Sequence, residues 1–492
     1  MPGDVPEMSE AKEWEEDRSI KYLLGRLLRK SFLSFALLRW VFWPSSPTGS
    51  SLPARPRPTA YLDGLRGFAA LIVYWHHHEL WPRTKAQTDI IENAFGSRGQ
   101  FYFAAFPGIR TVFGGGHWAV ATFFVISGYA LSVKPLRLIH AGDQTKVADS
   151  LSSALFRRWL RLFIPVICTT FVYLTSWHLL GIWVNGVNPR ATYLSELWAW
   201  YAELKGFSFV FHLGGDPWFT YNFHLWSIPV EFRGSVIVYT SLLALSRCSR
   251  NARLWLEAGL VFNFLYIVDG AHFAMFVAGM LLCDLELLAA KDDLPTCFGI
   301  LRRFKRLIVY HLLAISFYLG GVPVAGTDIQ PLRDSPGWYL LSFLKPQAVF
   351  EVKSFYLFWA AVFLVASVPH LPWLRRFFET RVCQFLGRIS YALYLVHGPI
   401  LSTLGDRLYA LVGWESEARR EHLAGWLNEL PLSKGGPMGL ELAFLLPHVV
   451  LLPLTLYCAE VVTRVVDEPS VRFPNWLYRK SLGQPAAGRL PA

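Results

Sequence analysis

The chain has 492 residues and a formal net charge of +11, yet 53% of its residues are hydrophobic and only 17% are charged. A soluble protein of this length would be expected to form several domains and to carry more charge. The composition therefore favours a multi-pass membrane protein. The Lys and Arg residues fall in short clusters between apolar runs rather than on one patch, which argues against a nucleic-acid partner.

The first 58 residues are expected to lie on the cytosolic side of the membrane. They begin with an acidic, polar stretch that lacks the basic start and apolar core of a cleavable signal peptide. Tyr22 to Trp43 alternates basic and apolar residues, which is typical of an amphipathic helix on an anionic leaflet. Pro44 to Pro58 is a Pro/Ser-rich linker. The sequence thus predicts a cytosolic segment at 1–58, a transmembrane domain at 59–473 and a cytosolic tail at 474–492.

Apolar runs of about 20 residues, the length of a membrane-spanning helix, recur through the transmembrane domain. Clusters of Lys and Arg follow alternate runs, as expected of cytosolic loops, while the other loops also contain Asp and Glu. The sequence therefore predicts an all-α, polytopic transmembrane bundle of about ten spans with both termini in the cytosol, and it does not indicate which cellular membrane. The expected spans lie near Tyr61 to Leu80, His117 to Val133, Leu160 to Val184, His224 to Ser246, Leu254 to Val268, Ala271 to Ala289, Leu307 to Val322, Phe355 to His370, Val382 to Leu404 and Leu440 to Val466.

The first span, LDGLRGFAALIVYWHHHELW, carries Arg66 near its start and the histidines His76, His77 and His78 near its end. Ionisable side chains inside a membrane segment are costly, so they mark a candidate functional site. Arg66 and His77 are eleven residues apart. That spacing is three helical turns plus about 20°, so the two side chains share one face about 16 Å apart. The alternative is snorkelling of interfacial side chains, which applies most to His76 and His78.

Two further stretches contain candidate residues. In the Phe-rich run TFFVISGYALS, Ser127 is either catalytic or, with Gly128, one of the small residues that let helices approach closely. In FRRWLRLFIPV, Arg158 and Arg161 are predicted one turn apart at the cytosolic rim. Guanidinium groups match the oxygen atoms of phosphates. The pair therefore indicates either a phosphate site or positive-inside anchoring of the helix.

The stretch FHLWSIPVEFRGS places His224, Ser227 and Glu231 at i, i+3 and i+7, which predicts that they share one helix face. A carboxylate in an apolar helix needs a partner, and the candidates are Arg233 or a charge on another helix. A purely structural buried ion pair is the alternative to a functional role.

Near the carboxy end, LGRISYALYLVHGPI places Arg388 at a cytosolic helix start and His397 deeper in the helix. Their nine-residue spacing is about 2.5 turns, so they are not expected to share a face. His397 is either a hydrogen-bonded core histidine or a catalytic residue.

Taken in order, the motifs YLDGLRGFAALIVYWHH, TFFVISGYALS, RRWLRLFIP, HLWSIPVEF and LGRISYALYLVHGPI resemble the acyltransferase 3 family of multi-spanning membrane acyltransferases. The resemblance covers roughly Tyr61 to Phe473, and the stretches IPVEFRGS, LYLVHGP and VVDEPSVRF are similar to the fungal branch. It implies transfer of an acyl group, commonly acetyl from acyl-CoA, to a hydroxyl of a carbohydrate, lipid or secondary metabolite. Ala121 departs from the acidic residue of many bacterial relatives, so the role of that acid does not carry over.

By motif, the resemblance identifies His77 with the family's essential histidine, Arg66 with the arginine before it, and Arg158 and Arg161 with its RxxR pair. We therefore expect His77 to act as a general base or as an acyl-accepting nucleophile. The three arginines would bind the phosphates of acyl-CoA, and Glu231 would orient a histidine or the acceptor.

The expected partners are acyl-CoA as donor substrate, a hydroxyl-bearing small molecule, glycan or lipid as acceptor, and the surrounding membrane lipids. No permanently bound cofactor is expected. The six cysteines form no CxxC pair, so we also expect neither a disulfide framework nor a metal site. The alternative function is a membrane transporter or flippase that uses His77 and Glu231 as a proton relay and leaves the thioester intact.

Overall fold

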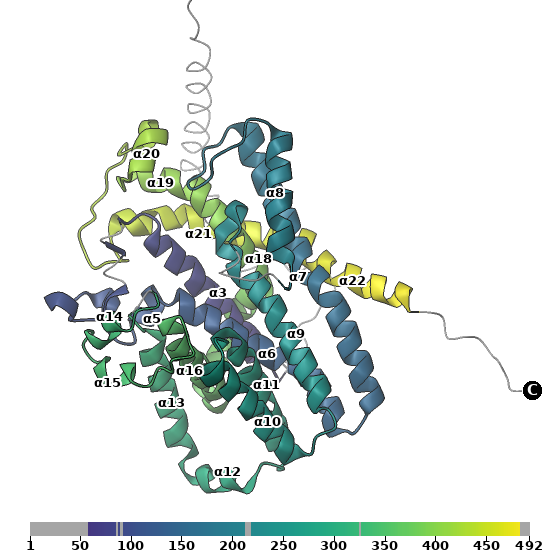
Figure 1. Cartoon of the computed structure of the whole chain (residues 1–492). Coiled ribbons are helices and arrows are strands. Elements are labelled where there is room, and N and C mark those ends of the chain that lie inside the picture. The colour runs from purple at the N-terminus through teal and green to yellow at the C-terminus, as the bar shows by residue number, and fades with distance from the viewer. Residues whose placement is uncertain (1–57, 85–86, 89–91, 212–217, 324–325, 483–492) are drawn as a thin grey trace, which may run out of the picture.

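The computed structural model describes residues 58–84, 87–88, 92–211, 218–323 and 326–482. The described residues fold into helices and connecting loops without a strand, which confirms the predicted all-α bundle (Figure 1). The predicted amphipathic helix and Pro/Ser linker lie outside the described residues, except for Pro58 at the end of the linker.

Each predicted span corresponds to a helix. These helices are α3 (Ala60–Leu80), α6 (Gly116–His140), α7 (Gln144–Leu180), α9 (Ser227–Leu245), α10 (Arg250–Phe262), α11 (Ala271–Ala289), α13 (Lys305–Gly320), α16 (Val352–Ser367), α18 (Arg381–Ile400) and α21 (Leu442–Val462). Shorter helices connect them, namely α5 (Arg110–Phe113), α8 (Tyr193–Ser208), η3 (Thr220–Trp226), η4 (Asn263–Ile267), α12 (Thr296–Leu301), α14 (Gln330–Arg333), α15 (Tyr339–Ser342), η6 (Val368–His370), α17 (Pro372–Phe378), η7 (Leu401–Gly405), α19 (Asp406–Leu411), α20 (Glu417–His422) and η9 (Thr463–Asp467).

Six helical stretches in the described part of the chain are long and apolar enough to cross a membrane. They are Gly116–His140, Gln144–Leu180, Thr220–Leu245, Ala271–Ala289, Val352–His370 and Leu442–Ser481. Helices α3 and α18 fall outside this group, and both carry arginine and histidine along their length. The count of ten spans stays a prediction.

Glycines bring the central helices into close contact. A methyl group at Gly67 of α3 would lie 2.2 Å from the backbone nitrogen of Gly387 of α18, and one at Gly128 of α6 would lie 1.9 Å from the carbonyl oxygen of Phe276 of α11. Any larger residue would therefore push these helix pairs apart, and small residues are the usual means of close packing between membrane helices. We call the contact of Gly67 with Gly387 the glycine seam.

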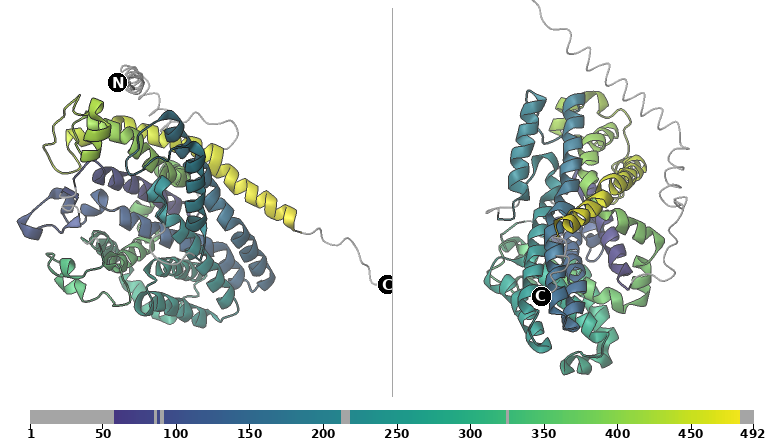
Figure 2. Two further views of the ribbon diagram at one scale, coloured as in Figure 1. Left: turned by 45° about the horizontal axis from the view of Figure 1, so that its top comes forward. Right: turned by 90° about the vertical axis from the view of Figure 1, so that its right-hand side faces the viewer.

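The last helix, α22 (Glu468–Ser481), continues from α21 through the π-helical turn η9 and extends away from the bundle (Figure 2). The helix is continuous through residue 473, the predicted end of the transmembrane domain. Glu468 lies in its first turn and Arg479 and Lys480 in its last, so its side chains complement the helix dipole.

Candidate active site

Three histidines from separate parts of the chain meet inside the bundle. The Nε2 atom of His397 lies 3.0 Å from Nδ1 of His77, and the two rings stack with centroids 5.0 Å apart. The ring of His224 lies 4.3 Å from that of His77 and 4.9 Å from that of His397, measured between centroids. We call these residues the histidine triad. His224 and His397 are buried, whereas His77 is partly exposed.

Bonds to α18 hold His224 in this triad. His224 lies in η3, whose backbone is non-helical at Asn222 (φ −172°, ψ 87°), two residues before it. The Asn222 amide donates to the carbonyl of Leu395 at 3.0 Å, and the Tyr394 hydroxyl donates to the carbonyl of His224. These bonds fasten η3 to α18.

Gly398 is required for this close contact. A methyl group at Gly398 would lie 2.5 Å from Nδ1 of His224 and 2.8 Å from the side-chain oxygen of Asn222. Nitrogen and carbon atoms do not approach so closely, so only glycine fits between the two segments at this position. The glycine of the motif LVHGP thus allows His224 to lie beside His397.

The hydrogen bonds assign the protons of His77 and His397. His397 Nδ1 lies 2.8 Å from the carbonyl oxygen of Tyr394, which can only accept, so Nδ1 carries the hydrogen. In a neutral ring Nε2 then has a lone pair, and it accepts from Nδ1 of His77 at 3.0 Å. Nε2 of His77 is consequently the atom with a free lone pair, as a general base requires.

The neighbouring histidines are buried, so snorkelling is wrong for both of them. His76 is 4% and His78 0% exposed. His78 Nδ1 lies 2.9 Å from the hydroxyl of Tyr409, and the hydroxyl of Tyr74 lies 3.0 Å from Nδ1 of His448. This second group joins α3 to α19 and α21.

Arg66 is held against α18. Its Nε donates to the hydroxyl of Ser390 at 3.0 Å and its Nη2 to the carbonyl of Gly387 at 3.0 Å. The guanidinium also lies 3.4 Å from Asp63, and its side chain is 39% exposed. The glycine seam therefore positions Arg66 at one end of α3 while His77 lies near the other.

Arg158 and Arg161 lie on α7 as predicted but in different surroundings. Arg158 is buried and forms an ion pair with Glu231 at 2.5 Å. Arg161 is exposed on the next turn. The charges of Arg158, Arg66 and Asp467 act on it, so these groups form one charged cluster. Sequence reasoning missed Asp467, although it lies in the stretch VVDEPSVRF that carried part of the family resemblance.

His224 lies in the 3₁₀ helix η3, whereas Ser227 and Glu231 lie in α9, and the predicted common face of the three residues stays a prediction. The structure pairs Glu231 with Arg158 of α7. Of the two predicted alternatives, the partner of Glu231 is therefore a charge on another helix and not Arg233. The Nε and Nη2 atoms of Arg233 are buried without a hydrogen-bond partner among the described residues.

The remaining candidates lie apart from the triad. Arg388 forms an ion pair with Glu460 of α21, which is a contact between helices. That Arg388 and His397 do not share a face stays a prediction. Ser127 is partly buried on α6, and its neighbour Gly128 makes the close helix contact that was the structural alternative there.

The triad could also be considered as a set of metal ligands. One nitrogen of each ring lies within 4.8 Å of a nitrogen of the other two. A zinc ion at about 2.1 Å from each nitrogen would hold them no more than about 4.2 Å apart and would replace the hydrogen bond between His77 and His397. The hydrogen-bonded triad needs no ion to account for its geometry, and the expectation of no bound metal stays a prediction.

Comparison with known proteins identifies the family. Residues 59–458 match the family model described as "Acyltransferase domain". The chain is 30% identical over 469 residues to O-acetyltransferase PaAT-1 of Phomopsis amygdali, covering 86% of this chain and 85% of that protein. It is 23% identical over 479 residues to Acyltransferase clz18 of Cochliobolus lunatus, covering 86% and 96%. No solved structure matches the chain. The resemblance seen in the motifs is thereby confirmed, and the chain belongs to the acyltransferase 3 family and is an acyltransferase.

Proposed function

We propose that the protein is an integral membrane O-acyltransferase that moves an acyl group, in the simplest case acetyl, from acyl-CoA to a hydroxyl group. The observation that carries the proposal is the free Nε2 lone pair of His77 on a ring fixed by His397. A neutral imidazole is the side chain that can accept a proton near neutral pH. His77 is partly exposed, in contrast to the buried His224 and His397.

In the proposed reaction, Nε2 of His77 takes the proton of the acceptor hydroxyl while the hydroxyl oxygen attacks the thioester carbonyl. The tetrahedral intermediate then breaks its C–S bond and leaves the ester. The CoA thiolate takes the proton from the imidazolium and departs as the free thiol. His77 ends neutral, so the cycle needs no further reactant.

The intermediate carries a negative charge on the former carbonyl oxygen, which needs a hydrogen-bond donor. His224 supports this role because its Nε2 is buried beside His77 without a hydrogen-bond partner among the described residues. A hydrogen on that nitrogen is not taken up by a contact within the described part of the chain. We assign His224 as the donor to the oxyanion.

The charged cluster at the other end of α3 suits the donor. Arg161 is exposed and has no carboxylate within 4.0 Å among the described residues. Arg158 is already neutralised by Glu231, so we assign Glu231 to position Arg158 rather than to orient a histidine. Arg66 and Arg161 would then bind the phosphates of acyl-CoA. The rise of α3 places His77 about 16 Å from Arg66, and the pantetheine arm would cross this span.

The assay uses the full chain in lipid nanodiscs with acetyl-CoA, and water serves as the acceptor until a better one is known. Released CoA is measured with a thiol reagent. We expect His77→Gln to lose kcat by at least about 100-fold, because general-base catalysis contributes roughly that much. We expect Arg161→Gln to raise the KM for acetyl-CoA with little change in kcat.

Two exposed residues give matched controls, His311→Gln on α13 and Arg306→Gln beside it. Both should behave as the unmodified protein. Unchanged kinetics in both His77→Gln and Arg161→Gln would reject the proposal. A transporter would move its substrate without releasing CoA, so thioester cleavage that depends on His77 separates the two functions.

A further inference from the structure

A cavity of about 260 Å³ lies between α6, α11 and α16, with Trp218 before η3 and Trp226 at the end of η3. The three triad histidines are not among its lining residues. Most of its wall is apolar or aromatic, including Val120, Phe124, Trp218, Trp226 and Met275. A volume of this size holds a small molecule, and ligand pockets are usually lined in this way by apolar groups with a few polar ones.

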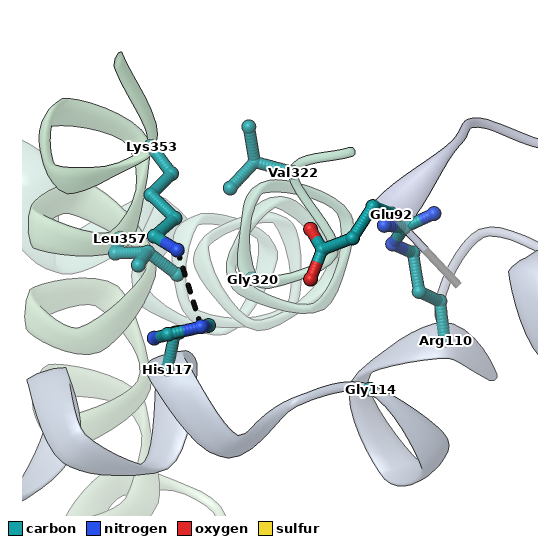
Figure 3. Close-up of a pocket in the computed structure, with 8 residues that line it drawn as sticks. All are labelled: Glu92, Arg110, Gly114, His117, Gly320, Val322, Lys353 and Leu357. Atoms are coloured by element: carbon teal, nitrogen blue, oxygen red, sulfur yellow. Dashed lines mark hydrogen bonds between the residues drawn. The ribbon is translucent and has the colours of Figure 1, made fainter. Parts of the chain in front are cut away.

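Most polar groups of the cavity come from His117 and from the start of α16, whereas His272 of α11 lies among the aromatic side chains, with its ring 5.5 Å from that of Phe124 and 5.9 Å from that of Trp226. Lys353 donates to Nε2 of His117 at 3.1 Å and lies 3.4 Å from Glu351. Figure 3 shows Lys353 and His117 in a smaller pocket that shares both residues with the cavity and is also lined by Arg110 and Glu92. Because the ammonium group can only donate, Nε2 of His117 accepts and its Nδ1 carries the hydrogen. The cavity thus offers several hydrogen-bonding groups along one edge and the imidazole of His272 among its aromatic side chains.

Two wall residues approach the triad through its neighbours in the chain. The ring of His117 contacts that of His76 with centroids 5.4 Å apart, and His76 directly precedes His77. Trp226 follows His224 by two residues in η3. A methyl group at Gly116 would lie 2.4 Å from the ring of His76, so this glycine lets the start of α6 lie against the histidines.

We infer that this cavity is the acceptor pocket of the proposed transferase and that its substrate is a compact, largely apolar alcohol rather than a sugar chain. The inference rests on the proposed function and narrows its acceptor. A sugar chain would need hydrogen-bonding groups around its whole circumference, because unpaired polar groups are costly to bury. In this pocket the apolar part of the alcohol would pack against Phe124, Trp226 and Met275. Its few polar groups would form hydrogen bonds with Lys353 and His117.

Ala121 allows a direct test, since it lines the cavity with a small side chain. Leucine at this position would fill part of the space, and overpacking of this kind costs about 1–3 kcal/mol, which corresponds to roughly a 5- to 150-fold rise in KM. Ala130 lies on the same helix α6 and is exposed, so Ala130→Leu is the matched control. Trp226→Phe widens the cavity instead and provides a second variant with the opposite effect.

The experiment uses the full chain in nanodiscs with acetyl-CoA and two sets of probes, the alcohols geraniol, farnesol and borneol and the sugars N-acetylglucosamine and chitobiose. Ester products are measured by mass spectrometry. We expect at least one of the alcohols to be acetylated. In Ala121→Leu its KM should rise about tenfold at an unchanged KM for acetyl-CoA. Ala130→Leu should match the unmodified protein, and Trp226→Phe should favour the larger alcohols.

The assignment of this cavity as the acceptor pocket would be overturned if only the sugars were acetylated. It would also be overturned if neither Ala121→Leu nor Trp226→Phe altered the KM for the acceptor. Hydrolysis of acetyl-CoA that depends on His77 but yields no ester of any of the alcohols would overturn it as well. That last result would leave the proposed function standing. Absence of any thioester cleavage would overturn the proposed function and the pocket with it.

Discussion

His397 is buried and its only assigned task is to hold His77, so replacing it tests the proton assignment directly. In His397→Leu the Nδ1 hydrogen of His77 loses its acceptor 3.0 Å away. A buried donor left without a partner costs about 1–3 kcal/mol, and the ring is then free to turn or to adopt the other tautomer. At about 1.4 kcal/mol per tenfold change, kcat should fall by roughly 5- to 150-fold.

His397→Gln provides the rescue, since its side-chain oxygen can occupy the place of Nε2 and accept the same hydrogen. We expect this variant to recover most of the lost kcat, because the amide accepts without itself taking a proton. Acetyl-CoA turnover is measured for both variants across pH, with KM determined separately. The KM for acetyl-CoA should stay the same, as the arginines that we assign to the donor lie at the other end of α3.

An unaltered kcat in His397→Leu would refute the reasoning, and so would equal losses in the leucine and glutamine variants. A protein that merely lost its packing would show both variants impaired and its melting temperature lowered. Thermal unfolding of each variant in nanodiscs distinguishes that result from a lost hydrogen bond.

Three further predictions concern contacts described above. Gly398→Ala should reduce kcat by at least about tenfold, because the added methyl group would overlap the ring of His224 and displace it. Unchanged turnover would show that catalysis does not require His224 at this position. Arg419→Met should lower the free energy of unfolding by about 3–5 kcal/mol, because it leaves the buried carboxylate of Asp406 without this cation. The control Arg420→Met breaks an exposed ion pair worth less than about 1 kcal/mol, and similar melting temperatures of the two variants would contradict the prediction. Dialysis against EDTA should leave acetyl-CoA turnover unchanged, and a loss restored by zinc would assign the triad to a metal.

The apolar runs were sufficient to locate the helices, because a segment that crosses a membrane must be apolar along its length. The bounds of α11 agree with the predicted Ala271 to Ala289. Helix α7 begins at Gln144, well before the predicted Leu160. Its first turns are polar, so an apolar run of membrane-spanning length does not reveal them. Pro229 in the first turn of α9 was a signal that could have marked the start of that helix.

The candidate site was predicted only as far as a single helix can reveal it. The spacing of Arg66 and His77 follows from the helical period, so both residues could be chosen from sequence. His397 lies 320 residues from its partner His77, and no spacing along one helix encodes such a contact. The non-helical backbone at Asn222 likewise depends on bonds to α18 that become visible only in three dimensions. Glu231 required a partner, and the sequence could not decide which of the many arginines supplies it.

The glycine seam has a consequence for which thioesters can react. Because the backbones of α3 and α18 touch at Gly67 and Gly387, the two helices cannot approach each other more closely there. Arg66 and His77 both lie on α3, so the rise of this helix fixes the distance between them at about 16 Å. In the reaction that we propose, a donor bound by its phosphates must have an arm that matches this length, so analogues with a truncated or extended pantetheine should place their carbonyl carbon short of His77 or beyond it.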